Sequence, residues 1–189
     1  MSEVAPQLDD ATIREQATRL LRALLRIDTS NPPGRETPAA MELARYLEGA
    51  GVDCELVARH PDRANLIARI PGTGDGPSLC FLGHTDVVPA PDPDEWAFQP
   101  FSGHLDEDGF VWGRGATDMK NETVTRTVAF ATLARSGFRP RGDLVLVCQS
   151  DEEDGTEGVG LAWLVRERPD LACDYAIDEG GGTRYELAD

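Results

Sequence analysis

Residues 145–155 read VLVCQSDEEDG, an unbroken apolar run that leads directly into four consecutive carboxylates. An apolar run of this kind is typical of a strand that is buried on both faces of a sheet in an α/β protein. Four adjacent carboxylates at the end of a buried strand repel one another and resist removal from water. The stretch therefore indicates an α/β fold and raises the question of what neutralises its acidic residues.

Helical and strand-like segments alternate along the rest of the chain. Apolar residues at helical spacing predict helices over 9–27, over a segment that ends at Gly51, over about 119–135 and over 159–168. Short β-rich runs predict strands at 52–59, 64–70, 78–84, 143–149 and 173–178, and 102–115 predicts a hairpin with its turn at 106–109. This order favours an α/β fold in which helices sandwich a mostly parallel or mixed sheet.

The composition excludes several classes of partner. The 189-residue chain has a net charge of -16 and a pI near 4.5, so nucleic acid phosphates and anionic lipid surfaces would repel it. The N-terminal residues show no basic segment followed by an apolar one, and no apolar run approaches the roughly 18 residues of a membrane span. We therefore expect a cytoplasmic protein that binds neither nucleic acid nor membrane.

Four cysteines lie far apart in strand-like apolar segments, at Cys54, Cys80, Cys148 and Cys173. Because no two of them form a C-x-x-C pair, zinc bound by cysteine is not expected. We interpret them as buried free thiols in a reducing compartment.

Side chains that can bind metals follow three of the expected strands. Ligands collect at the carboxyl ends of strands in open α/β sheets, so these side chains are expected to converge. Taken singly, each has an ordinary explanation, namely a packed histidine, a helix N-cap for a lone aspartate, or a solvated turn for an acid pair. The residues are His84 and Asp86, Glu152 and Glu153, Asp178 and Glu179, and Asp118 from the segment GRGATDMK (113–120).

Such a gathering of carboxylates requires positive charge nearby. The only basic residues that the sequence places near these motifs are Lys120 and Arg114, so one or two divalent metals are the economical explanation. A mixed set of imidazole and carboxylate ligands suits zinc, with cobalt or manganese as alternatives.

The spacing within two motifs suggests how the site is organised. In the H-x-D pattern, Asp86 lies on the same side of the strand as His84, where it can hold and orient the imidazole ring. The adjacent Glu152 and Glu153 cannot both face one atom, so one can bind metal while the other accepts a proton from metal-bound water.

Other candidate motifs are rejected. A calcium loop that begins at Asp92 would need glycine at its sixth position and glutamate at its twelfth, where the chain has Ala97 and Gly103. GTGDG (72–76) lies between two strands, which makes it a turn and not a nucleotide-binding loop.

Four motifs, in this order, resemble a known family of enzymes. They are GHTDVVPA (83–90), WGRGATDMKN (112–121), SDEEDG (150–155) and IDEGG (177–181). Together they resemble the dinuclear zinc peptidases and amidohydrolases, a family that includes aminoacylase, acetylornithine deacetylase, succinyl-diaminopimelate desuccinylase and carboxypeptidases G and S. TSNPPG (29–34) also looks familial, so the resemblance covers nearly the whole chain.

The resemblance implies ligands for two Zn²⁺ ions, for which Co²⁺ or Mn²⁺ can substitute. His84 resembles a ligand of the first metal, and Asp86 resembles the residue that orients it. Asp118 resembles the carboxylate that bridges the two metals. Glu179 resembles the remaining ligand of the first metal, with Asp178 beside it in a supporting role.

The resemblance also implies a reaction. Glu152 resembles the general base and Glu153 a ligand of the second metal. A metal-bridged water, deprotonated by Glu152, would attack the amide carbonyl of a peptide or N-acyl amino acid, and Glu152 would then protonate the leaving nitrogen. Many members of the family have glycine at the position of Asn121. Together with IDEGG (177–181), this residue makes the chain resemble the branch of carboxypeptidase S and the N-acyl-amino-acid hydrolases. The implied activity is a metal-dependent hydrolase of the deacylase or carboxypeptidase type, with a small-molecule substrate.

The family pattern also contains parts that this sequence does not show. In the family, a lid or dimerisation domain interrupts the catalytic domain, which then resumes and supplies a last metal-binding histidine. Apart from His84, the only histidines here are His60 and His104, which match no ligand of the family and are expected at the surface. We therefore expect 1–185 to be the N-terminal segment of the catalytic domain and 186–189 to begin the boundary to the lid.

Two consequences follow from this expectation. A homodimer would form through the lid. The second metal would lack one ligand in this chain, and the activity of the 189-residue chain would therefore be impaired. The alternative function is therefore a catalytically incomplete fragment that acts at most as a metal-binding module. A phosphoesterase with the same metals would need cationic phosphate clamps, which are scarce in this sequence.

Overall fold

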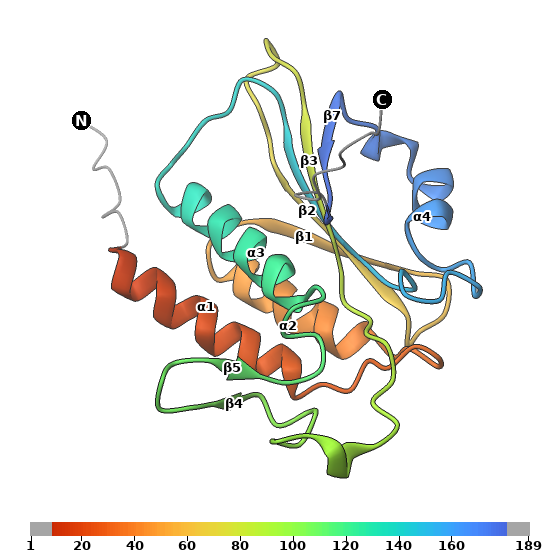
Figure 1. The fold of residues 1–189 in the computed structure, drawn as a ribbon. Coiled ribbons are helices and arrows are strands. Elements are labelled where there is room, and N and C mark those ends of the chain that lie inside the picture. Colours follow the sequence, from red (N-terminus) through yellow and green to blue (C-terminus); the bar gives the residue numbers. More distant parts are fainter. Residues whose placement is uncertain (1–8, 181–189) are drawn as a thin grey trace, which may run out of the picture.

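A five-stranded mixed sheet forms the centre of this computed structural model, which describes residues 9–180 (Figure 1). In order across the sheet, the strands are β1 (Asp53–Ala58), β2 (Ala64–Ile70), β6 (Leu144–Gln149), β3 (Leu79–His84) and β7 (Tyr175–Ile177). β2 runs antiparallel to both of its neighbours, whereas β3 runs parallel to both of its neighbours. The arrangement confirms the predicted α/β fold with a mixed sheet.

Helices cover both faces of this sheet (Figure 1). α2 (Thr37–Glu48) and α3 (Lys120–Arg135) pack on one face, with α1 (Asp10–Leu25) packed against these two helices, and α4 (Leu161–Glu167) lies against the other face. Short 3-10 turns form at η1 (Pro93–Glu95) and η2 (Pro169–Leu171). All four predicted helices are present, with bounds close to those expected.

The predicted hairpin forms a separate two-stranded sheet of β4 (His104–Leu105) and β5 (Val111–Trp112). Its turn lies where the sequence placed it, because the Gly109 amide donates to the Asp106 carbonyl at 3.2 Å. The Asp106 carboxylate also accepts the indole N–H of Trp112 at 2.6 Å. One aspartate thus fastens both the turn and the second strand.

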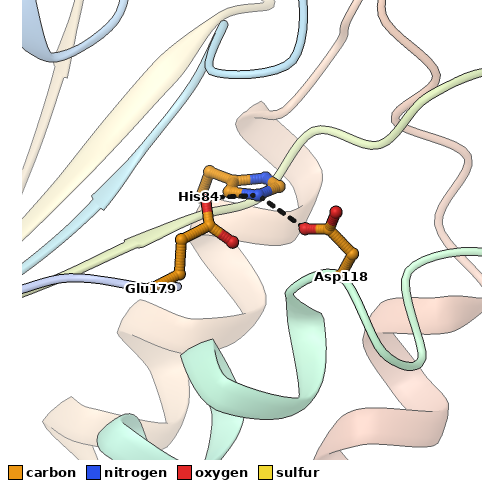
Figure 2. Close-up of side chains that lie close together, drawn as sticks. All are labelled: His84, Asp118 and Glu179. Atoms are coloured by element: carbon orange, nitrogen blue, oxygen red, sulfur yellow. Dashed lines mark hydrogen bonds and ion pairs between the residues drawn. The ribbon is translucent and has the colours of Figure 1, made fainter. Parts of the chain in front are cut away.

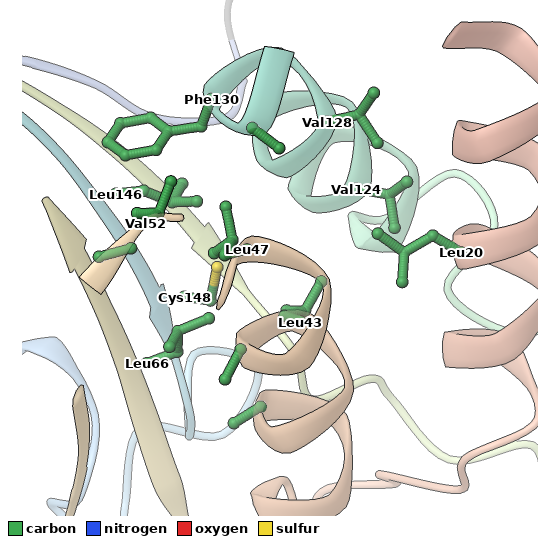
Figure 3. Packing of buried hydrophobic residues seen from close by; sticks show 14 of the residues in the cluster. Leu20, Leu43, Leu47, Val52, Leu66, Val124, Val128, Phe130, Leu146 and Cys148 are labelled. Atoms are coloured by element: carbon green, nitrogen blue, oxygen red, sulfur yellow. The ribbon is translucent and has the colours of Figure 1, made fainter. Parts of the chain in front are cut away.

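β6 lies inside the sheet, and its side chains alternate between two apolar clusters. Leu146 and Cys148 join the large cluster beneath α1, α2 and α3, part of which is drawn in Figure 3. Val145 and Val147 join a smaller cluster that includes Leu164 of α4. Burial on both sides explains why the apolar run in this strand is not interrupted by polar residues.

We expect Leu146→Ala to lower the free energy of unfolding by about 2–5 kcal/mol, because loss of a fully buried side chain leaves a cavity between sheet and helices. Chemical denaturation followed by circular dichroism measures the change. The matched control is Leu56→Ala on β1, whose side chain is 40% exposed and whose loss should cost about 0.5 kcal/mol. Equal losses in the two variants would contradict the placement of Leu146 in the core.

The register of the parallel strands brings three segments of the chain to one edge of the sheet. His84, the last residue of β3, is paired with Gln149, the last residue of β6. On the other side of β3, Phe81 is paired with Ile177, where β7 ends. The residues that follow β3, β6 and β7 therefore emerge together, which confirms the predicted convergence at the carboxyl ends of these strands.

The histidines outside the site lie in different surroundings. His60 is exposed, as expected. His104 was also predicted at the surface, but the structure corrects this: it is half-buried, and its ring stacks on Phe98 with the centroids 3.7 Å apart. The sequence pattern did not indicate this contact with Phe98, which precedes the hairpin.

All four cysteines are free thiols, as predicted. Cys80 and Cys148 are buried, whereas Cys54 and Cys173 are only half-buried, so full burial was wrong for two of the four. Within residues 9–180, no helix is both long enough and apolar enough to cross a membrane. The expected domain boundary at 185/186 lies outside the described residues.

Candidate metal centre

His84 is the centre of a small group of ligand-type side chains at the end of β3. Its side chain is almost fully buried, and its Nε2 lies 3.2 Å from Asp118 Oδ1 and 3.5 Å from Glu179 Oε1 (Figure 2). One donor atom from each of the three residues falls within 4.8 Å of the other two. Three segments that are far apart in the sequence thus present one nitrogen and two oxygens to the same point.

Asp118 reaches this point from the loop that precedes α3. The N-cap residue of α3 is Met119, and the cap makes no side-chain hydrogen bond. The Asp118 carboxylate instead faces His84 and is 67% exposed. The ordinary explanation of this aspartate as a helix N-cap therefore does not hold, and its carboxylate is free to bind a ligand.

The other ring nitrogen of His84 is fixed by Asp86. Nδ1 lies 2.9 Å from the main-chain oxygen of Asp86 and 3.5 Å from its carboxylate Oδ1. The sequence suggested that the carboxylate orients the ring, but the main-chain oxygen is the closer partner. Both contacts leave Nε2 as the nitrogen that faces Asp118 and Glu179.

Electrostatics around His84 favour the charged ring in the metal-free protein. Burial disfavours the charged form, but the hydrogen bond and charge of Asp86 and the charge of Glu179 outweigh it and raise the pKa of His84 to about 9. Burial also opposes ionisation of Asp86, yet hydrogen bonds from His84 and Asn31 hold the pKa of this carboxyl below its usual range. The site is therefore arranged to hold positive charge.

The four consecutive carboxylates that follow β6 lie in four different environments. Asp151 is buried, and Asp154 is exposed. Glu152 is exposed, with Oε2 3.7 Å from His84 Nε2. Glu153 is half-buried and is not among the three residues grouped around His84. Mutual repulsion is thus reduced because the chain directs neighbouring carboxylates to different places.

Two carboxyls near His84, those of Glu153 and Glu179, have pKa values above their usual range. Burial raises the pKa of both Glu153 and Glu179, and the charge of His84 opposes this effect. The neighbouring Asp118 and Glu152 raise both pKa values further by repulsion. A bound cation would relieve this repulsion.

Asp178 supports the backbone that carries Glu179. Its Oδ1 accepts the amide of Glu179 at 2.9 Å, and its main-chain oxygen accepts Arg126 Nη2 at 2.9 Å. Arg126 belongs to α3, and the same Nη2 donates to Glu122 one turn earlier. The end of β7 is thus tied to α3, a connection that the sequence did not predict.

The sequence pointed to Lys120 and Arg114 as the only basic residues near the acids, and the structure corrects this. Lys120 is fully buried, and burial lowers its pKa to about 8. Its Nζ donates to the carbonyls of Leu24 and Ile27 at the end of α1 and not to the acids. The Arg114 guanidinium lies over an indole ring, 4.9 Å from its centroid. Neither residue contacts the carboxylates.

The basic residue that does contact the four consecutive carboxylates at 151–154, the acidic run, is Arg63, which the sequence did not indicate. Its Nη2 lies 3.4 Å from Asp151 Oδ1, and both side chains are buried. Glu36 and Asn31, also buried, belong to the same group of contacts. Asn31 lies within TSNPPG, which the sequence did mark, but no motif or spacing links Arg63 to Asp151 across 88 residues.

The grouped side chains fit a divalent metal of the transition series. One imidazole nitrogen with carboxylate oxygens suits zinc, cobalt or manganese better than calcium or magnesium, which prefer oxygen alone. Fold and site together define an α/β protein with a carboxylate-rich candidate metal site at the carboxyl edge of its sheet. The chain belongs to peptidase family M20/M25/M40, whose model matches residues 80–188.

Curated relatives and solved structures agree with this family. Succinyl-diaminopimelate desuccinylase from Cereibacter sphaeroides is 43% identical over 136 residues, which is 70% of this chain and 35% of that protein. The same enzyme from Paracoccus denitrificans is 38% identical over 159 residues, 81% of this chain and 40% of that protein. The chain therefore spans little more than a third of the length of these relatives.

The fold is shared with a metallo-carboxypeptidase of the M20 family, Sso-CP2 from Sulfolobus solfataricus. The TM-score is 0.75 with 24% identity, over 93% of this chain and 38% of that one. It is also shared with YXEP of Bacillus subtilis, described as a dinuclear metal binding peptidase, at a TM-score of 0.60 and 21% identity over 86% and 41% of the two chains. At these identities the likeness shows the fold.

Proposed function

We propose that the whole protein is a metal-dependent hydrolase that cleaves an amide bond of a peptide or an N-acyl amino acid. The observation that carries this proposal is the position of the Glu152 carboxylate, 3.7 Å from the His84 nitrogen that also faces Asp118 and Glu179. A carboxylate that lies next to a group of possible metal ligands, but is not one of the three grouped residues, can accept and donate protons there.

The geometry around His84 and the resemblance to the family support a set of ligands. His84, Asp118 and Glu179 would hold the first metal, with Asp118 shared between two metals and Glu153 on the second. Zinc is the proposed metal, and cobalt or manganese would substitute. Bound metals supply Lewis acidity, which polarises the substrate carbonyl and acidifies water.

The chain's own residues would carry the proton transfer. Glu152 would accept a proton from the attacking water and return it to the leaving nitrogen, so that the amide ends as a carboxylate and an amine. Asp86 would keep the His84 ring in place through Nδ1. The exposure of Glu152 and Asp118 is consistent with a substrate that approaches this edge of the sheet from solvent.

The substrate class is best tested with a panel of small amides. The names of the relatives make N-succinyl amines the first members of the panel, followed by other N-acyl amino acids and by dipeptides. The whole protein, loaded with Zn²⁺ or Co²⁺, should release free amine from at least one of these substrates. Absence of hydrolysis across the panel, with both metals bound, would exclude the proposal.

A second candidate applies to the 189-residue chain by itself. In the described residues, donor atoms of three side chains converge, which is enough to hold one metal. The chain alone would then be a metal-binding module without turnover. One tightly bound zinc per chain and no hydrolysis would support the module, whereas two zinc ions with turnover would exclude it.

A further inference from the structure

A buried ion pair lies beneath the acidic run, outside the group of ligand-type side chains. Arg63 is 6% exposed and Glu36 is fully buried, and the guanidinium binds the carboxylate through two hydrogen bonds of 2.6 and 2.7 Å. Gly34, at a φ of 94°, makes room for this pair, since a Cβ there would lie 2.1 Å from Arg63 Nε. The guanidinium is thus enclosed and fixed in one orientation.

This ion pair holds Asp151, the first residue of the acidic run. Asp151 donates its main-chain amide to Glu36 Oε1 at 3.2 Å, and its Oδ1 lies 3.4 Å from Arg63 Nη2. Its Oδ2 accepts the amide of Gly158 at 3.0 Å. Asp151 has a φ of 60°, in the left-handed region that residues other than glycine rarely adopt. These bonds compensate for that conformation, which turns the chain sharply after β6.

The same network continues to the residues around His84. Asn31 Nδ2 donates to Asp151 Oδ1 at 3.1 Å and to Asp86 Oδ2 at 2.9 Å. The Asp86 carboxylate in turn accepts the main-chain amides of Glu152 at 3.2 Å and Glu153 at 3.0 Å. Asp86 therefore contacts both the His84 ring and the backbone that carries the two glutamates.

We propose that Arg63 and Asn31 are positioning residues that set where the Glu152 and Glu153 carboxylates stand relative to His84. Glu36, Asp86 and Asp151 are three buried carboxylates in one small volume. Arg63 contacts two of them, and Asn31 bridges two of them. Without these donors, the buried carboxylates would repel one another, and the turn at Asp151 would open.

The catalytic meaning of this inference rests on the proposed function, but its first test does not. Amide hydrogen exchange of Glu152 and Glu153 in the metal-free chain reports directly on their bonds to Asp86. We expect Arg63→Met to speed their exchange at least about tenfold, since each bond lost exposes an amide to water. Asn31→Leu removes the bridging donor but leaves the Arg63–Glu36 pair intact, so it decides the question if Arg63→Met does not fold.

The matched control is Arg69→Met. Arg69 lies on β2, the strand that begins directly after Arg63, and forms an ion pair with Asp143 at 2.6 Å at the opposite end of β6. Its loss should change stability without changing exchange at the acidic run. If Arg63→Met and Asn31→Leu leave the exchange of both amides as it is in Arg69→Met, the inference is overturned.

Metal affinity and kinetics of the whole protein complete the test. We expect Arg63→Met and Asn31→Leu to weaken binding of a second Co²⁺ by about 10- to 100-fold and to lower kcat by a similar factor with little change in KM. Altered exchange and affinity in a protein that hydrolyses no amide would refute the proposed function and support the positioning roles. Unchanged affinity and kcat in active variants would refute the positioning roles alone.

Discussion

Glu152→Gln is expected to lower kcat of the whole protein by about 10²- to 10⁴-fold while leaving its metal content unchanged. Glutamine keeps the shape of the side chain but cannot accept a proton from water. The side chain of Glu152 is 39% exposed, so the substitution should not disturb packing. Steady-state kinetics on the best amide of the substrate panel, with metal analysis of the same samples, measures both quantities.

Two comparisons sharpen this prediction. Glu157→Gln alters an exposed glutamate of the same loop and should leave kcat unchanged. Glu153→Gln should show the reverse pattern to Glu152→Gln. It should lower the content of the second metal, and any fall in kcat should result from that loss of metal. If Glu152→Gln releases a metal, Glu152 is a ligand and not the base. Activity within about tenfold of the unaltered protein would remove it from the reaction altogether.

The acidic run shows how one sequence motif is divided among different partners. Its buried member, Asp151, is stabilised within the protein by the charge of Arg63 and by a hydrogen bond from Asn31. Glu152 and Glu153 contact no arginine or lysine among the described residues; Glu152 lies 3.7 Å from His84, and burial with neighbouring carboxylates raises the pKa of Glu153. The remaining charge is left for a cation to neutralise. A metal would therefore bind more tightly to the folded turn than to an opened one.

The parts of this arrangement that depend on local pattern could be predicted from the sequence. The apolar run of β6 is continuous because both faces of the strand are covered, and this places the acids at the carboxyl edge. Parallel strands then bring His84 and Glu179 to the same edge. Asp118 could be predicted because a family motif marks it.

The supporting contacts could not be predicted, because they depend on tertiary packing. Glu36 is a charged residue in a polar segment, and nothing local indicates that it is fully buried against Arg63. Asp151 has the composition of a solvated turn, yet it is held in a left-handed conformation by residues 88 and 120 positions away. Lys120 lies in the motif of the site but caps α1, since its long side chain turns away from the acids.

The second large effect expected is on the pH dependence of metal binding. A metal binds neutral imidazole, so a proton must leave His84 whenever the ring is charged in the metal-free protein. Because the pKa of His84 is raised to about 9, the apparent affinity should increase about tenfold per pH unit up to about pH 9 and then level off. If the ring had an ordinary pKa of about 6.5, the affinity would level off near pH 6.5. The affinity gained between about pH 6.5 and pH 9 therefore separates the two cases, and it amounts to about 300-fold.

Competition with a chelator of known protonation behaviour, at several pH values between about 6 and 9, measures this dependence for Zn²⁺. An indicator dye should also detect about one proton released per zinc near neutral pH. Asp86→Asn removes a charge that raises the His84 pKa, so the break should move to lower pH, whereas His104→Gln should leave it in place. A plateau that begins near pH 6.5 in the unaltered chain would contradict the prediction, because it would mean that Asp86 and Glu179 do not stabilise the charged ring.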